Sequence, residues 1–152
     1  MSKRPLAAPL GLALLALLPS CMHTPMPPPP SVGAAVATPS PVDAADGIVM
    51  LHTRLMVAGL GCGSVWQDPG AFGHYASFVS RNAAAIRAAQ QAKAARLGGM
   101  AAFDSEHTIL SNRESMRMRQ MGAQAYCTEM KAPFYAAMAA PAAKLPTLAQ
   151  GL

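Results

Sequence analysis

Three cysteines give this chain of 152 residues its widest choice of chemistry. A cysteine sulfur can carry a lipid, close a disulfide, or act as a nucleophile or redox group. Cys21, Cys62 and Cys127 lie far apart, and no CxxC motif places two of them together. This spacing argues against a thioredoxin-like redox pair and against covalent c-type haem.

The segment before Cys21 has the composition of a bacterial export signal. Lys3 and Arg4 give it a positive start, and an apolar run follows from Leu6 to Leu18. Secretory signals combine such a charged start with an apolar run of roughly 7–15 residues. The run is shorter than the roughly 20 residues of a membrane-spanning helix. We therefore expect residues 1–20 to be a signal peptide.

Two cleavage sites compete behind this run. Leu18 and Ser20 resemble the aliphatic and small residues that precede the cysteine of a bacterial lipoprotein, although Pro19 departs from the usual Ala, Ser or Thr. An ordinary cleavage site, Ala-Val-Ala at 35–37, lies well beyond the apolar run. The resemblance implies that Cys21 becomes the lipidated first residue of the mature chain. Export without lipid and an uncleaved anchor are the alternatives.

The expected location is the periplasmic side of the cell envelope. Met22 is not the Asp that typically retains lipoproteins at the inner membrane, so an outer-membrane lipid anchor is favoured over a soluble periplasmic or secreted protein. Without residues 1–20 the net charge falls from +5 to about +3, because ten Lys and Arg stand against seven Asp and Glu. These cations are scattered and aromatic residues are scarce, so nucleic acid is not an expected partner.

Residues 21–41 carry the lipidation site and a proline-rich linker. Prolines stand at 25, 27–30, 39 and 41. Proline lacks a backbone N–H and fixes φ, so this composition favours polyproline II over a helix. We expect a disordered, semi-rigid tether that holds a folded domain away from the membrane.

The rest of the chain predicts an all-α domain at residues 42–140. Ser40-Pro41-Val42-Asp43 is typical of a capped helix start. The apolar residues of the first helix then recur at spacings of three and four: Ile48, Leu51, Leu55, Ala58 and Cys62. Glycines at 59, 61 and 63 are expected to mark the end of this helix.

Two further long helices and one short helix are expected. Asp68-Pro69 predicts the start of a helix at 70–97, with Phe72 and Tyr75 on its buried stripe. A third helix is expected at 100–131, with weak points at 104–105 and 111–112, and Pro133 should end it. A short helix at 134–140 and a flexible tail at 141–152 complete the chain. The expected fold is a small three-helix up-down-up bundle with a short fourth C-terminal helix.

This path brings two cysteines together. The first and third helices of an up-down-up bundle are parallel, so Cys62 and Cys127 should lie at the same end. If Cys21 carries lipid, the other two form an even pair in an oxidising compartment. We therefore expect a Cys62–Cys127 disulfide, which stabilises by about 4 kcal/mol in the chain-entropy model. Two free thiols with a redox role are the alternative.

No catalytic cluster is apparent. HExxH, GxSxG and phosphate-loop motifs are absent from the sequence, and the Cys-Gly-Ser-Val-Trp run at 62–66 lacks the cysteine of the papain signature at Val65. The four histidines have no ligand spacing between them: His23, His52, His74 and His107. We expect no enzyme, no cofactor and no metal site.

Methionine and arginine are concentrated on the predicted third helix. Both residue types are enriched at protein interfaces. The candidate partner contact is Arg113, Arg117, Met118 and Met121. The first hypothesis is therefore a non-enzymatic, lipid-tethered accessory subunit or envelope interaction factor, whose partners are the membrane and another envelope protein. Because thioether and imidazole groups suit Cu(I), a copper or small-ligand carrier is the alternative.

Three short patterns carry a family resemblance. They are residues 51–58 (Leu-His-Thr-Arg-Leu-Met-Val-Ala) leading to Cys62, residues 75–79 (Tyr-Ala-Ser-Phe-Val), and Tyr126-Cys127. On these residues the chain resembles short exported helical proteins of alphaproteobacteria that have no assigned function. The same two cysteines recur in that group, so the resemblance is compatible with the disulfide and implies no activity.

Overall fold

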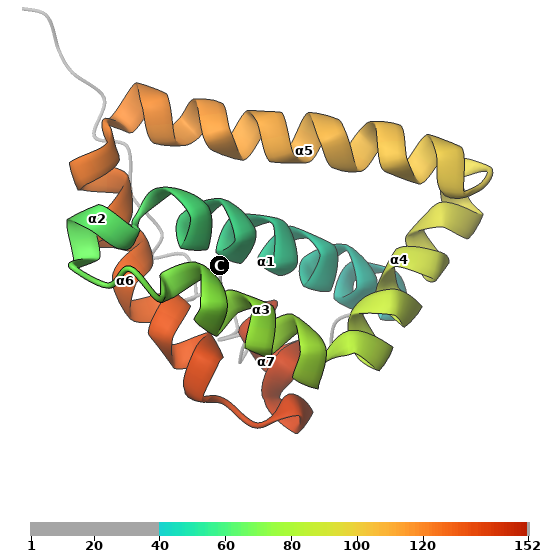
Figure 1. The fold of residues 1–152 in the computed structure, drawn as a ribbon. Coiled ribbons are helices and arrows are strands. Elements are labelled where there is room, and N and C mark those ends of the chain that lie inside the picture. Colours follow the sequence, from blue (N-terminus) through green and yellow to red (C-terminus); the bar gives the residue numbers. More distant parts are fainter. Residues whose placement is uncertain (1–39, 152) are drawn as a thin grey trace, which may run out of the picture. The chain divides into compact units, whose positions relative to one another are not determined.

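The computed structural model describes residues 40–151, and all regular structure in this range is helical (Figure 1). The expected all-α fold is thus confirmed. The elements are α1 Pro41–Gly61, α2 Gly63–Trp66, α3 Ala71–Arg81, α4 Ala83–Leu97, α5 Met100–Met121, α6 Ala123–Ala139, the 3-10 turn η1 Ala142–Lys144 and α7 Leu145–Leu148. The expectations for residues 1–39, including the signal peptide and the lipid at Cys21, lie outside this range.

Helix α1 is the centre of the domain and packs against every other α-helix of residues 40–151. It begins as the sequence predicts: the Ser40 hydroxyl accepts from the Asp43 N–H at 3.2 Å, and the Asp43 carboxylate accepts from the Ser40 N–H. The predicted stripe of α1 is buried, and so are Val49 and Thr53 between its members. Helices pack on several sides of α1, and therefore one stripe does not account for its burial.

Figure 1 shows α1 and α5 side by side and running in the same direction. The chain segment that connects them forms two helices, α3 and α4, where the sequence predicts one. Asn82 separates them, and its side-chain amide donates to the Phe78 carbonyl at 2.8 Å. Asparagine breaks helices in this way because its side chain competes for backbone partners.

The predicted end of the third helix is wrong. The break falls at Gly122, whose φ of 81° only glycine adopts freely, and α6 then runs through Pro133. Proline removes one helical hydrogen bond, and the Glu129 carbonyl that loses it belongs to an exposed residue that water can reach. Phe134, which was expected to begin a separate helix, is instead fully buried within α6.

The C-terminal segment is more ordered than the expected loose tail. Residues 142–148 form η1 and α7, and Leu145 is 1% exposed where α7 packs against α1. The chain approaches α1 so closely that a Cβ at Gly47 would lie 2.9 Å from the Ala149 carbonyl oxygen. A glycine at position 47 is therefore needed for this contact.

Candidate functional site

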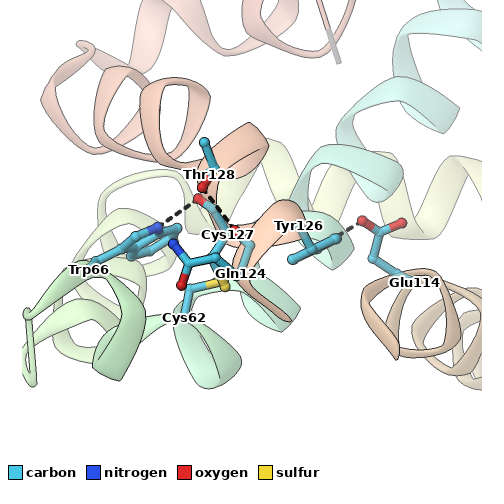
Figure 2. The surroundings of a disulfide bond; sticks show 7 residues. All are labelled: Cys62, Trp66, Glu114, Gln124, Tyr126, Cys127 and Thr128. Carbon is cyan, nitrogen blue, oxygen red and sulfur yellow. Dashed lines mark hydrogen bonds between the residues drawn. A yellow bond between two sulfur atoms is a disulfide. The ribbon is translucent and has the colours of Figure 1, made fainter. Parts of the chain in front are cut away.

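The predicted disulfide is present. It joins Cys62, which caps the end of α1, to Cys127 in the second turn of α6, with a Cα–Cα distance of 5.4 Å. Both cysteines are fully buried. Figure 2 shows the Trp66 indole beside the bond, where its N–H donates to the Cys127 carbonyl at 2.7 Å. A buried, closed bond of this kind is structural, and it leaves neither sulfur as a free thiol for redox chemistry.

A buried acid lies next to the disulfide. Glu114 on α5 is 7% exposed and accepts from the Tyr126 hydroxyl at 2.8 Å (Figure 2). The guanidinium groups of Arg54 and Arg117 lie 3.4 and 3.1 Å from the same carboxylate oxygen. These partners compensate the buried charge and tie α5 to α1 and α6. Glu114 and Arg117 are three residues apart on α5, a spacing that brings two side chains together on one side of a helix.

The ion pairs alter the proton affinity of the side chains around Glu114. The hydrogen bond to Glu129, and then the one to Glu114, hold the pKa of Arg117 above its ordinary value. Burial raises the pKa of the Tyr126 hydroxyl, and its hydrogen bond to Glu114 raises it further. Both groups therefore keep their protons at neutral pH, and neither offers a base for catalysis.

The four predicted contact residues do not form one surface. Arg113 is exposed and makes no side-chain hydrogen bond or ion pair within residues 40–151. Arg117 is held inside by Glu114 and Glu129, and its guanidinium carbon lies 5.4 Å from the centre of the Tyr126 ring. Met118 is half-buried and Met121 is 39% exposed. Of the four, Arg113 and Met121 are the more accessible.

The structure instead exposes apolar side chains at the end of α1. Leu60 is 64% exposed, more than any other large apolar side chain of residues 40–151, and Phe72 on α3 is 46% exposed. A groove of about 620 Å³ lies between them. A second groove of about 290 Å³ lies on the other side of Leu60, where Met118 and Arg119 line it. We call Leu60, Phe72, Met118 and Arg119, with the two grooves, the Leu60 surface.

Glycines form much of the floor of these grooves. Gly59 and Gly61 lie in the last turn of α1, which ends at Gly61 as the sequence predicts. A Cβ at Gly61 would overlap the Met118 side chain, and one at Gly59 would lie 3.2 Å from the Tyr75 Cβ. The glycines therefore let α3 and α5 approach the end of α1, and Gly61 exposes its backbone on the groove floor, whereas Gly59 is buried.

The uncompensated charge of this domain is mainly positive. Four of its seven acidic side chains pair with Arg or Lys, Asp68 lies 3.5 Å from the His74 ring, and Asp43 caps α1. Six cations of residues 40–151 have no ion pair: Arg81, Arg87, Arg113, Arg119, Lys131 and Lys144. Arg119 is the single charged residue in the lining of either groove. The Leu60 surface is thus apolar with a positive edge.

A second cluster gathers histidines from α1 and α5. The His52 ring bonds to the Tyr75 hydroxyl at 2.9 Å, and the ring centres of His52 and His107 are 5.9 Å apart. Burial, and then the neighbouring His107, lower the pKa of His52 to about 4. Burial also lowers the pKa of His107. One ring nitrogen of each is buried without a partner, so both rings are neutral at pH 7.

The two clusters also lack the ligand grouping of a metal site among the residues that the structure describes. Within residues 40–151, no three His, Cys, Asp or Glu side chains are grouped to hold a metal ion. The helices in this range also include none that is long and apolar enough to cross a bilayer. Comparison of the chain with protein-family models, curated proteins and solved structures finds no match.

The sequence missed three residues of the Leu60 surface, namely Leu60, Phe72 and Arg119, and the first two left a signal. Leu60 lies off the stripe formed by Leu51, Leu55 and Ala58, so helical periodicity alone places it outward. Phe72 was expected to be buried, but a second stripe of the same helical spacing, Ala71, Tyr75 and Phe78, is the one that packs inward, and Phe72 lies one position beside it.

Proposed function

We propose that this protein is a non-enzymatic, lipid-tethered protein of the cell envelope that works by binding another envelope protein through the Leu60 surface. The observation that carries the proposal is the exposure of Leu60, at 64%, between two open grooves. Exposed apolar side chains beside a groove are typical of interaction sites, where aromatic, methionine and arginine residues are enriched.

The surface lies on a rigid base. The disulfide at Cys62 is two residues from Leu60, and Trp66 packs against Phe134 with ring centres 4.7 Å apart. A surface whose backbone is already ordered loses little entropy on binding, which favours affinity. The expected lipid at Cys21 would concentrate this surface near the membrane, where an envelope partner would meet it.

The test introduces Leu60→Glu into the full chain, which is expressed in the cells whose envelope it belongs to. The new charge should prevent burial against a partner, and we expect complexes captured by crosslinking and co-purification to fall at least tenfold. Ile109→Glu is the matched control, because Ile109 is 56% exposed on α5 away from both grooves. Both variants should melt within a few degrees of the parent protein. A Leu60→Glu chain that keeps its complexes would refute the proposal.

A further inference from the structure

One residue of the larger groove has an unfavourable backbone conformation. Gln67, the C-terminal cap of α2, has φ 55° and ψ 36° and is the single non-glycine residue of positive φ within residues 40–151. Glycine adopts this left-handed conformation without penalty, whereas a Cβ is crowded there. Glycine is also the residue that most often follows a helix in this conformation. Gln67 is thus a less stable choice than glycine at its own position.

The internal contacts of Gln67 do not require a glutamine. Its backbone N–H donates towards the carbonyl oxygens of Gly63 and Ser64, and a glycine at position 67 would keep both contacts. Its side-chain amide is exposed and makes no hydrogen bond to any part of the chain that the structure describes. The same holds for the Ser64 hydroxyl. Both residues line the larger groove, so two unused polar groups adjoin its apolar wall.

These groups define the chemistry of an occupant. An amide both donates and accepts hydrogen bonds, as a peptide backbone does, and the exposed glycine floor allows a backbone to come close. Leu60 and Phe72 offer apolar contact. Arg119 lines the second groove, on the other side of Leu60, and has no acidic partner within residues 40–151. The groove volume of about 620 Å³ is within the usual size of a ligand pocket. Charge complementarity therefore favours an acidic segment over a basic one.

We infer that Gln67 is a partner-binding residue, and that the groove beside Leu60 receives an extended protein segment with an apolar side chain and a nearby carboxylate. The apolar side chain lies between Leu60 and Phe72, the Gln67 amide bonds to the segment's backbone, and Arg119 pairs with its carboxylate. This inference rests on the proposed function, since it names the partner chemistry of the same surface.

The experiment places the photo-crosslinking residue benzoylphenylalanine at Phe72 of the full chain in its own envelope. An aromatic group thus replaces an aromatic group, and the same residue at Ile109 is the matched control. We expect an adduct from position 72 and none from position 109. Mass spectrometry of the adduct should map it to a protein segment with an apolar residue and an Asp or Glu within a few positions. An adduct with lipid alone, or with a segment free of acids, would overturn the inference.

Variants of Gln67 in this crosslinking chain separate stability from binding. Gln67→Gly relieves the backbone crowding, so the melting temperature should rise by about 4 °C while the adduct falls at least fivefold. Gln67→Ala keeps the crowding without the amide, so its adduct should fall equally without a gain in melting temperature. A Gln67→Gly chain with an undiminished adduct would overturn the binding role of Gln67. That result leaves the proposed function standing, because only the Leu60→Glu comparison decides it.

Discussion

Each end of the α1–α5 pair contains one buried charged side chain surrounded by side chains of opposite charge, and the buried charge has a different sign at the two ends. At the disulfide end, the buried acid Glu114 lies among Arg54, Arg117 and the Tyr126 hydroxyl. At the other end, which we call the Lys93 end, a buried lysine of α4 lies among acids: its ammonium group is 2.8 Å from Glu106 and 3.5 Å from Asp46. Each buried charge ties three helices together.

The difference lies in how well the partners are shielded from water. The Glu114 side chain is 9% exposed and that of Arg54 is 13% exposed. The Lys93 side chain is also shielded, at 11%, but Asp46 is 44% and Glu106 is 36% exposed. Exposed ion pairs contribute little, and salt screens them, whereas a buried charge that loses its partner is strongly destabilising. The disulfide end should therefore be the stable base and the Lys93 end the more easily perturbed region.

The largest effect should come from removing the disulfide. In a Cys62→Ala, Cys127→Ala chain the unfolded state regains the entropy of a loop that spans 65 residues, which corresponds to about 4 kcal/mol. Urea unfolding of the domain, followed by circular dichroism, measures this loss. The Leu60 surface should also loosen, so hydrogen exchange should rise in α2 before it rises in α4. A loss below about 1 kcal/mol would mean that the disulfide end is not the stable base of the domain.

A smaller effect should follow from Glu114→Gln. The variant leaves two guanidinium groups beside a neutral amide, and we expect a loss of about 3 kcal/mol in the free energy of unfolding. The matched change at the Lys93 end, Glu106→Gln, should cost less than about 1 kcal/mol because Asp46 still faces Lys93 and water reaches both acids. Equal losses in the two variants would remove the distinction between the ends.

Acidification should have the next largest effect. The pKa of His52 is about 4 in the folded chain and near 6.5 when unfolded, so the unfolded state binds more protons between these pH values. Stability that is present above pH 6.5 should therefore be lost as the pH falls towards 4, by up to about 3 kcal/mol. His107 adds to this loss, because burial lowers its pKa too; among the groups that face it, Asp104 opposes this shift and Lys93 supports it.

His52→Gln is the variant that isolates the contribution of this ring. Glutamine can still bond to the Tyr75 hydroxyl but does not titrate, so the slope of stability against pH between 4 and 6.5 should become flatter. His74→Gln is the control, because the His74 side chain is 55% exposed. Urea midpoints at several pH values measure both. Parallel slopes for the parent and the His52→Gln chain would show that acid acts elsewhere.

The sequence predicts the parts of this fold that depend on local chemistry. The capping box at Ser40 and the apolar spacing of α1 are local patterns, and they are confirmed. The Cys62–Cys127 bond, predicted from the parity of the cysteines and a three-helix path, is confirmed too, although Cys127 lies on α6 and not on the expected third helix. The ends of helices are harder to predict where tertiary packing decides whether the helix continues. Pro133 should end a helix by propensity, but Phe134 and Cys127 on the same helix are fully buried, and that packing outweighs one lost hydrogen bond.

The site was less predictable because it depends on which side of a helix meets a neighbour. Arg113 and Arg117 are four residues apart on one helix, yet only Arg117 reaches Glu114 and Glu129. No local pattern separates them, since the acid Glu129 lies on the next helix. The burial of Phe72 was mispredicted for a related reason, because α3 offers two stripes of helical spacing and packing selects the one with Ala71, Tyr75 and Phe78. Contacts between distant segments decide which arginines and apolar residues are free to bind.

Salt offers the smallest and most local comparison. The two exposed acids of the Lys93 end, Asp46 and Glu106, hold α4 against α1 and α5, and Arg96 adds a second contact to Asp46. At 1 M NaCl the Debye length falls to about 3 Å, so these pairs should weaken by less than about 1 kcal/mol in total. Hydrogen exchange should then quicken in α4 while α6, held by the disulfide and by Glu114, keeps its protection. If hydrogen exchange quickened equally in both helices, salt would be acting on global unfolding. The two ends would then unfold together and would not differ in local stability.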